Sequence, residues 1–184
     1  MHKSILVLII LLTAASAHAN QITNGSFENT SKTFVGDANH VDSLPSGSLL
    51  IPGWTTFNGV PTAWIENGNP WAISASDGSF FLDLTGYGNH GTYGGVMQSF
   101  ATVPGTDYIA TFDRGYGGNS AAFGGPVSVL ASAAGSSATF TSGSGTPNPA
   151  VWNKETFSFM ATSTTTDLSF KGISTAGGFY IGLD

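Results

Sequence analysis

Tryptophan, tyrosine and asparagine side chains gather in one polar, glycine-containing stretch of the chain. Trp64 precedes the letters IENGN, Trp71 follows NGNP, and Tyr87 lies in GYGNHGTYGG. Flat aromatic rings stack on the apolar C–H faces of sugars, and amide groups bond to sugar hydroxyls. The stretch therefore predicts a carbohydrate-binding platform of Trp64, Trp71 and Tyr87, with Asn67 and Asn69 on the hydroxyls. Burial of Trp64 and Trp71 in the core is the alternative that the sequence leaves open.

Residue types that carry catalysis are scarce. The chain has no cysteine and no GxSxG motif, and His40 in GDANHVD has no second histidine at a metal-ligand spacing. A glycosidase needs two carboxylates about 5 to 9.5 Å apart. The carboxylates available are those of the aspartates and of Glu28, Glu66 and Glu155. Their positions in the sequence do not show whether any two of them face each other. We therefore expect that the protein is not an enzyme and keep a hydrolase as the least favoured alternative.

The N-terminus has the pattern of an export signal. Lys3 provides a positive charge, an apolar run extends from residue 5 to residue 15, and Ala17 and Ala19 form an AxA cleavage site. The apolar run is shorter than the roughly 20 residues needed to span a membrane. We therefore predict a cleaved signal peptide over residues 1–19 and no membrane insertion afterwards. The mature chain is expected to be secreted and extracellular, with the periplasm as the alternative.

Charge and composition limit the partners of the mature chain. Without Lys3 it has four basic and eleven acidic residues, a formal charge of −7. A negative charge of this size argues against nucleic acids and anionic membranes as partners. The absence of cysteine excludes disulfides, so the fold must rely on apolar burial. The length is that of one domain, which we place at residues 20–184.

Short runs after residue 78 alternate apolar and small polar residues, which is the pattern of half-buried β-strands. VPGT between two runs predicts a type II turn around Pro104 and Gly105. Thr30–Ser48 is polar and predicts a long loop, and Asp83 is expected to point outward or to a second layer. The side chains expected in the core are Phe80, Leu82, Tyr108, Phe112, Phe157, Phe159 and Phe170, with Trp54 and Trp152 in the core or at a corner.

No stretch of the mature chain keeps a helical apolar repeat. The strand and turn signals recur at the spacing of a sandwich or jelly roll. The sequence therefore predicts an all-β protein, an antiparallel β-sandwich of roughly nine to eleven short strands with almost no helix.

Five short motifs occur in a fixed order along the chain: NGSFE, IPGW, SDGSFFLDL, MQSFATVPGTDYIATFD and the closing LD. In this order they resemble the choice-of-anchor type of bacterial secreted domains, which are similar to the plant cell-wall proteins called domain of unknown function 642. The resemblance covers nearly the whole mature chain. It implies a galactose-binding-like jelly roll, association with cell-wall or matrix polysaccharide, and no catalytic residues. Members usually continue beyond LD, so we expect either a complete domain or one cut short at its C-terminus.

The resemblance also implies a metal. Related carbohydrate-binding jelly rolls hold a structural Ca²⁺ with an acidic side chain near NGSFE and an aspartate of the final strand, and this chain has Glu28 and Asp184 there. Calcium takes six to eight oxygen ligands, which backbone carbonyls of a glycine-rich loop would complete. We therefore expect a structural calcium ion at Glu28 and Asp184. An exposed Glu28 at the end of a strand is the alternative.

The function expected from residues and resemblance is that of a secreted module that binds carbohydrate. Its partner would be an extracellular polysaccharide or a cell-surface glycan. A structural or adhesive matrix protein without specific sugar binding is the main alternative. A jelly-roll hydrolase comes last.

Overall fold

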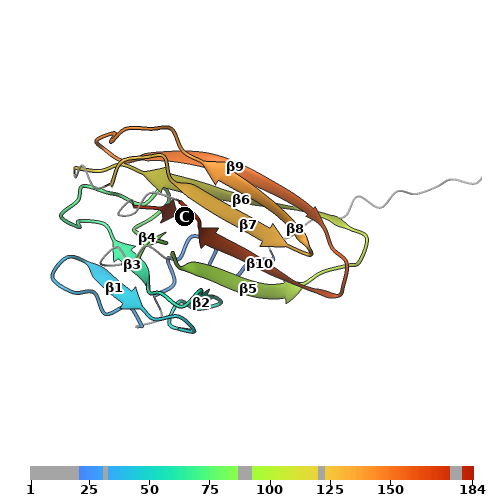
Figure 1. Cartoon of the computed structure of the whole chain (residues 1–184). Helices are drawn as coiled ribbons and strands as arrows, with labels where there is room; N and C mark the ends of the chain where they lie inside the picture. The colour runs from blue at the N-terminus through green and yellow to red at the C-terminus, as the bar shows by residue number, and fades with distance from the viewer. Residues whose placement is uncertain (1–20, 31–32, 87–92, 120–122, 175–179) are drawn as a thin grey trace, which may run out of the picture.

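The computed structural model describes residues 21–30, 33–86, 93–119, 123–174 and 180–184. These residues form two antiparallel β-sheets that pack face to face, which confirms the predicted β-sandwich (Figure 1). The described residues contain eleven strands, within the expected number, and no α-helix. Consequently, no helix in this part of the chain could cross a membrane.

The first sheet has six strands in the spatial order β1-β3-β4-β11-β6-β9. All neighbouring pairs are antiparallel. The longest pairing joins β6 to β9, from Asp107 opposite Met160 to Tyr116 opposite Val151. The bounds are β1 (Val41–Leu44), β3 (Thr62–Glu66), β4 (Phe80–Asp83), β6 (Asp107–Tyr116), β9 (Val151–Met160) and β11 (Gly182–Leu183).

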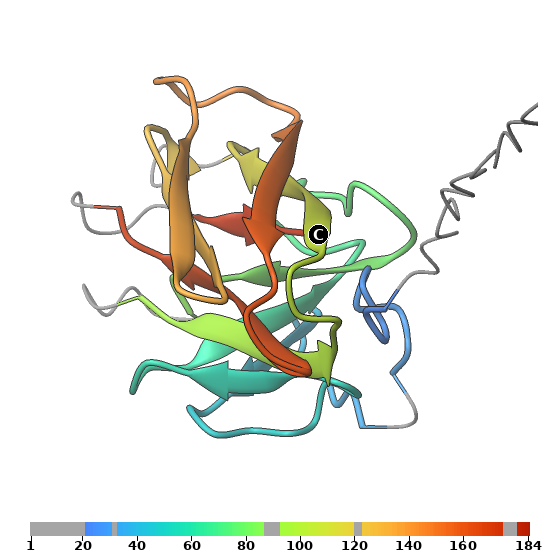
Figure 2. The same ribbon diagram turned by 90° about the vertical axis from the view of Figure 1, so that its right-hand side faces the viewer.

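The second sheet has five strands in the order β2-β5-β10-β7-β8. β10 lies at its centre and pairs with both β5 and β7. The two sheets are seen from a second direction in Figure 2. The bounds are β2 (Thr55–Phe57), β5 (Gly95–Ala101), β7 (Ser128–Ala133), β8 (Ser136–Thr141) and β10 (Thr165–Gly172).

The main core lies between the two sheets. The Phe112 ring of β6 lies 4.7 Å from the Phe170 ring of β10 and 5.1 Å from the Phe140 ring of β8, centroid to centroid, so aromatic contacts join the sheets. Every side chain expected in the core belongs to this cluster. Five of them are buried, and Phe80 and Tyr108 are partly buried and pack against the others. Alternation along the strands therefore predicted the inner face correctly.

A second apolar layer covers the outer face of the six-stranded sheet. It contains Ile65 of β3 and Phe81 of β4, both buried, and Tyr180, which precedes β11. The Trp152 ring of β9 packs edge-on against Phe81 and Tyr180, at centroid distances of 5.8 and 6.4 Å. Trp54 is buried in the main core, so both tryptophans lie where the sequence predicted. Because of this layer, β3 and β4 are buried on both faces.

Two predictions of local structure have different outcomes. The VPGT turn is confirmed, because Thr106 N donates to Val103 O over 3.1 Å and Gly105 has a φ of +79°. The prediction that Thr30–Ser48 is only a loop is wrong. It contains β1, whose ends Val41 and Leu44 are buried. Four residues are too few for alternation to be recognised, and pairing with β3 supplies the rest of the strand's stability.

The short strand β11 joins the two halves of the six-stranded sheet. It pairs with β4 on one side and with Arg114 and Gly115 of β6 on the other. The ladder ends where Asp113 and Asp184 exchange backbone hydrogen bonds of 2.7 and 3.0 Å. Towards Asp107, no described residue pairs with this edge of β6. Because backbone groups alternate along a strand, those of Ile109 and Thr111 face the same open edge as Asp113.

A buried ion pair joins β6 to β9. The Nε and Nη2 atoms of Arg114 donate to Oε1 of Glu155 over 3.2 and 2.7 Å. The Arg114 side chain is only 4% exposed and that of Glu155 is 21% exposed. Loss of one partner would leave a charge in the protein interior, which makes this pair sensitive to substitution.

Candidate functional site

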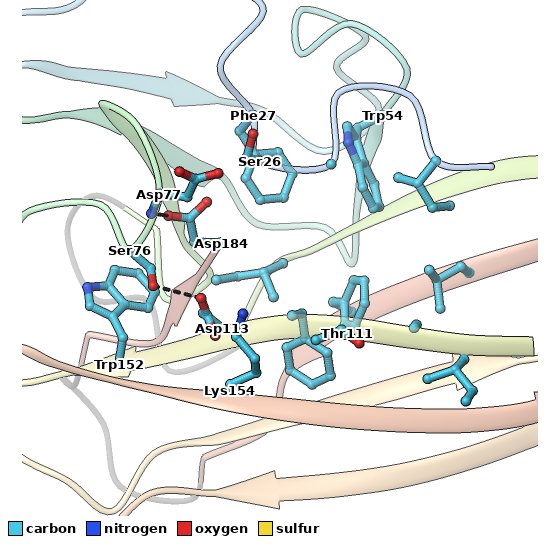
Figure 3. A pocket seen from close by; sticks show the side chains of 18 residues that line it. Ser26, Phe27, Trp54, Ser76, Asp77, Thr111, Asp113, Trp152, Lys154 and Asp184 are labelled. Atoms are coloured by element: carbon cyan, nitrogen blue, oxygen red, sulfur yellow. Dashed lines mark hydrogen bonds between the residues drawn. The ribbon is translucent and has the colours of Figure 1, made fainter. Parts of the chain in front are cut away.

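A groove of about 810 Å³ follows the open edge of β6. One wall is Ile109–Asp113 of β6, and the opposite wall is the N-terminal segment with Ser26 and Phe27 (Figure 3). Asp184 lies at one end of the groove and Trp54 lies farther along it. The volume is that of a small-ligand site, which typically measures about 300 to 1,000 Å³.

The floor of the groove is apolar. Phe112, Leu168 and Phe170 line it from the main core, and Phe27 and Trp54 line it from the opposite wall. Each of these side chains is at most 6% exposed, and the groove reaches them because no described strand covers the open edge of β6 at this level. The floor therefore offers only small patches of aromatic and aliphatic surface, and the more exposed Ile109 and Trp152 add apolar surface at its sides.

The end of the groove beside β11 is polar. Ser76 Oγ donates to Asp113 Oδ2 over 2.7 Å, and Asp77 N donates to Asp184 Oδ2 over 2.9 Å (Figure 3). Lys154 of β9 lies directly across the ladder from Asp113 and also lines the groove. Hydroxyl, carboxylate and ammonium groups therefore converge on one end of an otherwise apolar groove.

Glu28 holds the loop that carries Ser76 and Asp77. Its Oε1 accepts hydrogen bonds from the backbone N–H groups of Ser79 and Phe80, over 2.8 and 2.7 Å. Gly78 lies against this carboxylate with a φ of +72°, and a Cβ there would be 2.4 Å from the Glu28 carboxyl carbon. Glycine suits this position, because it tolerates the positive φ and leaves room for the Glu28 carboxylate, which a larger residue would displace.

The carboxyl group of Asp184 has an unusual environment. Burial raises its pKa to about 7, and repulsion from Glu28 and Asp77 acts in the same direction, against the hydrogen bonds from the Asp77 and Ser76 backbone. Its Oδ1 atom is buried and has no hydrogen-bond partner in the described part of the chain. The group therefore changes its charge near neutral pH, at the polar end of the groove.

Glu28 and Asp184, the residues predicted to hold calcium, both accept hydrogen bonds from the backbone of the loop that precedes β4. Their mutual repulsion and the partnerless Oδ1 of Asp184 fit a cation at this place. However, the described residues contain no group of three or more aspartate, glutamate or histidine side chains arranged to hold a metal. Two carboxylates would need backbone carbonyls or water as further ligands. The calcium site stays a prediction.

The predicted aromatic platform does not form as expected. Trp64 is completely buried, so the prediction of an exposed Trp64 is wrong and the core alternative holds. Its ring packs against Phe34 and Phe80, at centroid distances of 5.3 and 5.8 Å. Trp71 is partly buried in the second apolar layer, edge-on to Phe123. Tyr87 lies outside the described residues.

The two asparagines of the predicted platform build the loop between β3 and β4. Asn69 is buried, contrary to prediction, and its amide donates to Glu66 O and Ile73 O over 3.1 and 2.6 Å. Asn67 accepts from Ala75 N over 2.7 Å and donates to the Gly78 carbonyl over 3.1 Å. These backbone contacts engage the amides that were expected to bind sugar hydroxyls.

The sequence-based reasoning missed Asp113, Trp152 and Lys154 as groove residues. The sequence did indicate that Trp152 and Lys154 point away from the main core, because they occupy the positions of β9 that alternate with its inward-pointing side chains. Only the register of β6 and β9 shows that Lys154 lies opposite Asp113.

Fold and groove together define the class of protein: a jelly-roll β-sandwich with a surface groove of apolar and aromatic side chains and an acidic end. Within that class, the family model "Protein of unknown function (DUF642)" matches residues 20–177, and the chain belongs to this family. No sequence among the curated proteins matches the chain. The finer resemblance to choice-of-anchor domains stays a prediction.

Several solved structures are similar in fold at low sequence identity. A CBM4 structure is 17% identical, with 89% of this chain and 95% of that chain covered and a TM-score of 0.42. A C-terminal family 22 carbohydrate binding module of Clostridium thermocellum Xyn10B is 15% identical (79% and 95% covered, TM-score 0.43). TmCBM61 in complex with β-1,4-galactotriose is 10% identical (90% and 95% covered, TM-score 0.43). Likeness at this level carries no argument about the ligand.

Proposed function

We propose that this chain is an exported β-sandwich module that binds carbohydrate in the groove beside β6. The groove itself is the observation that carries the proposal, because it combines an apolar, aromatic floor with a polar end. Sugars present the matching surfaces, with apolar C–H faces and hydroxyl edges on the same ring. Export rests on the signal-peptide pattern of residues 1–19.

The polar end supplies the groups that would orient a sugar. Asp113 accepts hydrogen bonds from hydroxyls, Lys154 donates to ring or hydroxyl oxygens, and Ser76 does both. Trp152, which lines the groove and is only partly buried, offers an aromatic surface beside them. Shallow sites of this kind bind with dissociation constants of roughly micromolar to millimolar, or about −8 to −4 kcal/mol.

The test is calorimetric titration of residues 20–184 with a panel of soluble plant and bacterial polysaccharides. Asp113→Ala and Lys154→Ala should each weaken binding of the polysaccharide that the parent binds, by about tenfold if one good hydrogen bond is lost. Asp107→Ala is the matched control, because Asp107 is exposed on the same strand outside the groove. If both groove variants bind like the parent, the groove is not the sugar site. If the parent binds nothing in the panel, the proposal fails.

The open edge of β6 favours a second candidate, a structural or adhesive matrix protein. Ile109 is 70% exposed, and its backbone and that of Thr111 face the groove. Unpaired strand edges recruit extended polypeptide segments, here from a second copy of the chain. Sedimentation at increasing concentration should then show association that Thr111→Pro abolishes, since proline removes the outward N–H. A chain that stays monomeric at all concentrations eliminates this candidate.

The structural calcium ion is proposed for Glu28 and Asp184. It would neutralise two carboxylates that repel each other and would tie the N-terminal segment and the final strand to the loop that closes the polar end. Its role would be structural, because both residues already hold backbone groups of that loop.

A further inference from the structure

A buried carboxyl group outside the groove, that of Asp83, has no part in the proposed site. Asp83 is the last residue of β4 and is 7% exposed. In the sheet it lies between Ala63 of β3 and Gly182 of β11. Leu82 and Leu84 lie in the main core and Asp83 alternates with them along β4, so of the two predicted positions, outward or towards a second layer, the second-layer position holds. The second apolar layer covers this face of the sheet.

One oxygen of Asp83 collects three hydrogen bonds. Oδ1 accepts from Thr85 N over 2.9 Å, from Thr85 Oγ1 over 2.7 Å and from Ile181 N over 3.1 Å. Leu84 N in turn donates to Ile181 O over 2.9 Å. Asp83 thus fastens the residue that leads into β11 to the end of β4. As β11 joins the two halves of the six-stranded sheet, this contact helps to hold the halves together.

Among the described residues, no cation forms an ion pair with Asp83. The ion pairs of the described residues are His40 with Glu66 and Arg114 with Glu155, and neither involves Asp83. The ionisable groups that face it are Tyr93, from the segment before β5, and Tyr180, from the segment before β11. Burial and the charge of Asp83 raise the pKa of both tyrosines, so both are neutral below pH 10.

The carboxylate of Asp184, the residue that follows β11, also raises the pKa of the Tyr180 hydroxyl by charge repulsion. That hydroxyl is buried beside Gly182 and has no hydrogen-bond partner in the described part of the chain. The surroundings that the described residues give Asp83 are therefore apolar, neutral or negative. They favour an uncharged carboxyl group.

We propose that Asp83 is a pH-sensitive fastening of β11, which holds the two halves of the six-stranded sheet more firmly in mildly acidic surroundings than at neutral pH. Protonation on Oδ2 removes the buried charge and leaves Oδ1 free to accept its three hydrogen bonds. The fold then keeps the contact without the cost of a desolvated carboxylate.

The direction of the effect follows from the pKa of Asp83, which burial raises from 3.8 to about 6 although its hydrogen bonds act against this. The folded protein keeps the proton to a higher pH than the unfolded chain does. The stabilisation is therefore complete below about pH 4 and is lost as the pH rises to about 6. Relative to pH 7.5, the folding equilibrium constant should gain about tenfold at pH 5 from this group.

The experiment compares urea unfolding of the parent and Asp83→Asn at pH 5.0 and 7.5. Asparagine keeps the accepting oxygen but cannot ionise, so the gain on acidification should be about tenfold smaller in the variant. Asp184 contributes in the same direction but equally to both proteins, so it cancels in the comparison. Asp107→Asn is the matched control and should keep the pH dependence of the parent, since Asp107 is exposed.

Carboxyl-carbon NMR of the parent gives a readout that does not require the variant to fold. The Asp83 resonance should titrate near pH 6, and the Ile181 amide should exchange more slowly at pH 5 than at pH 7.5 after correction for intrinsic rates. A titration near pH 4, or an Asp83→Asn variant with the parent's pH dependence, overturns the proposal. Neither measurement uses a sugar, so the result is independent of the proposed function.

Discussion

Replacement of Trp64 by alanine distinguishes a core tryptophan from a sugar-binding one. The side chain is completely buried between Phe34 and Phe80, and both rings lie within 6 Å of it, at 5.3 and 5.8 Å. Removal of a buried tryptophan side chain costs about 3 to 5 kcal/mol, because apolar burial is lost and a cavity remains. For a chain of this length, each kcal/mol lowers the melting temperature by about 2 to 4 °C. Trp64→Ala should therefore melt roughly 6 to 20 °C below the parent.

Two further variants control for the nature of the loss. Trp64→Phe keeps an aromatic ring and removes the indole N–H, which is buried and has no partner in the described part of the chain. It should lose clearly less stability than Trp64→Ala. Trp71→Ala should also lose less, since Trp71 is partly exposed and packs edge-on against Phe123.

The assay is differential scanning calorimetry of residues 20–184, together with polysaccharide titration of whichever variants remain folded. If Trp64 is a core residue, Trp64→Ala lowers the melting temperature, and the fraction that remains folded binds polysaccharide as the parent does. A Trp64→Ala protein that melts with the parent but no longer binds polysaccharide would refute the reasoning. It would restore the original platform, with Trp64 as a ligand-binding side chain.

Three more predictions concern charges and backbone around the groove. Glu155→Ala should lower the free energy of unfolding, measured by urea titration, by about 3 to 5 kcal/mol because it leaves the Arg114 charge buried. The double variant Arg114→Leu with Glu155→Leu should lose much less stability, because no unpaired charge remains. Gly78→Ala should loosen the loop held by Glu28 and lower the melting temperature, and an unchanged melt would show that the close approach is not maintained. If calcium binds, saturating Ca²⁺ should stabilise the parent by about 2.7 kcal/mol at a hundredfold excess over Kd, and Glu28→Gln should abolish the gain; equal melting in calcium and chelator contradicts the site.

Alternation predicted one face of each strand but not how many faces are buried. Leu82, Phe157 and Phe159 were assigned to the core because apolar residues recur at every second position around them, and they are buried. In β3 the same reasoning failed, since Trp64 faces the main core while Ile65 faces the second layer. A strand buried on both faces shows no alternation. Its aromatic side chain therefore resembled a loop residue.

The sequence by itself determined the fold class, the VPGT turn and most of the inner core, because these depend on local backbone preference and on a period of two residues. It also pointed to Glu28 and Asp184, which both accept hydrogen bonds from the backbone of the loop before β4, whereas the calcium ion expected between them stays a prediction. Only the tertiary structure decided where a ligand could bind. The groove combines residues of the N-terminal segment, β6, β9, β10 and β11, and the farthest apart, Ile22 and Leu183, are separated by 161 positions in the chain. Their proximity follows from strand order and register, which are set by the packing of the whole sandwich and leave no mark at any single position.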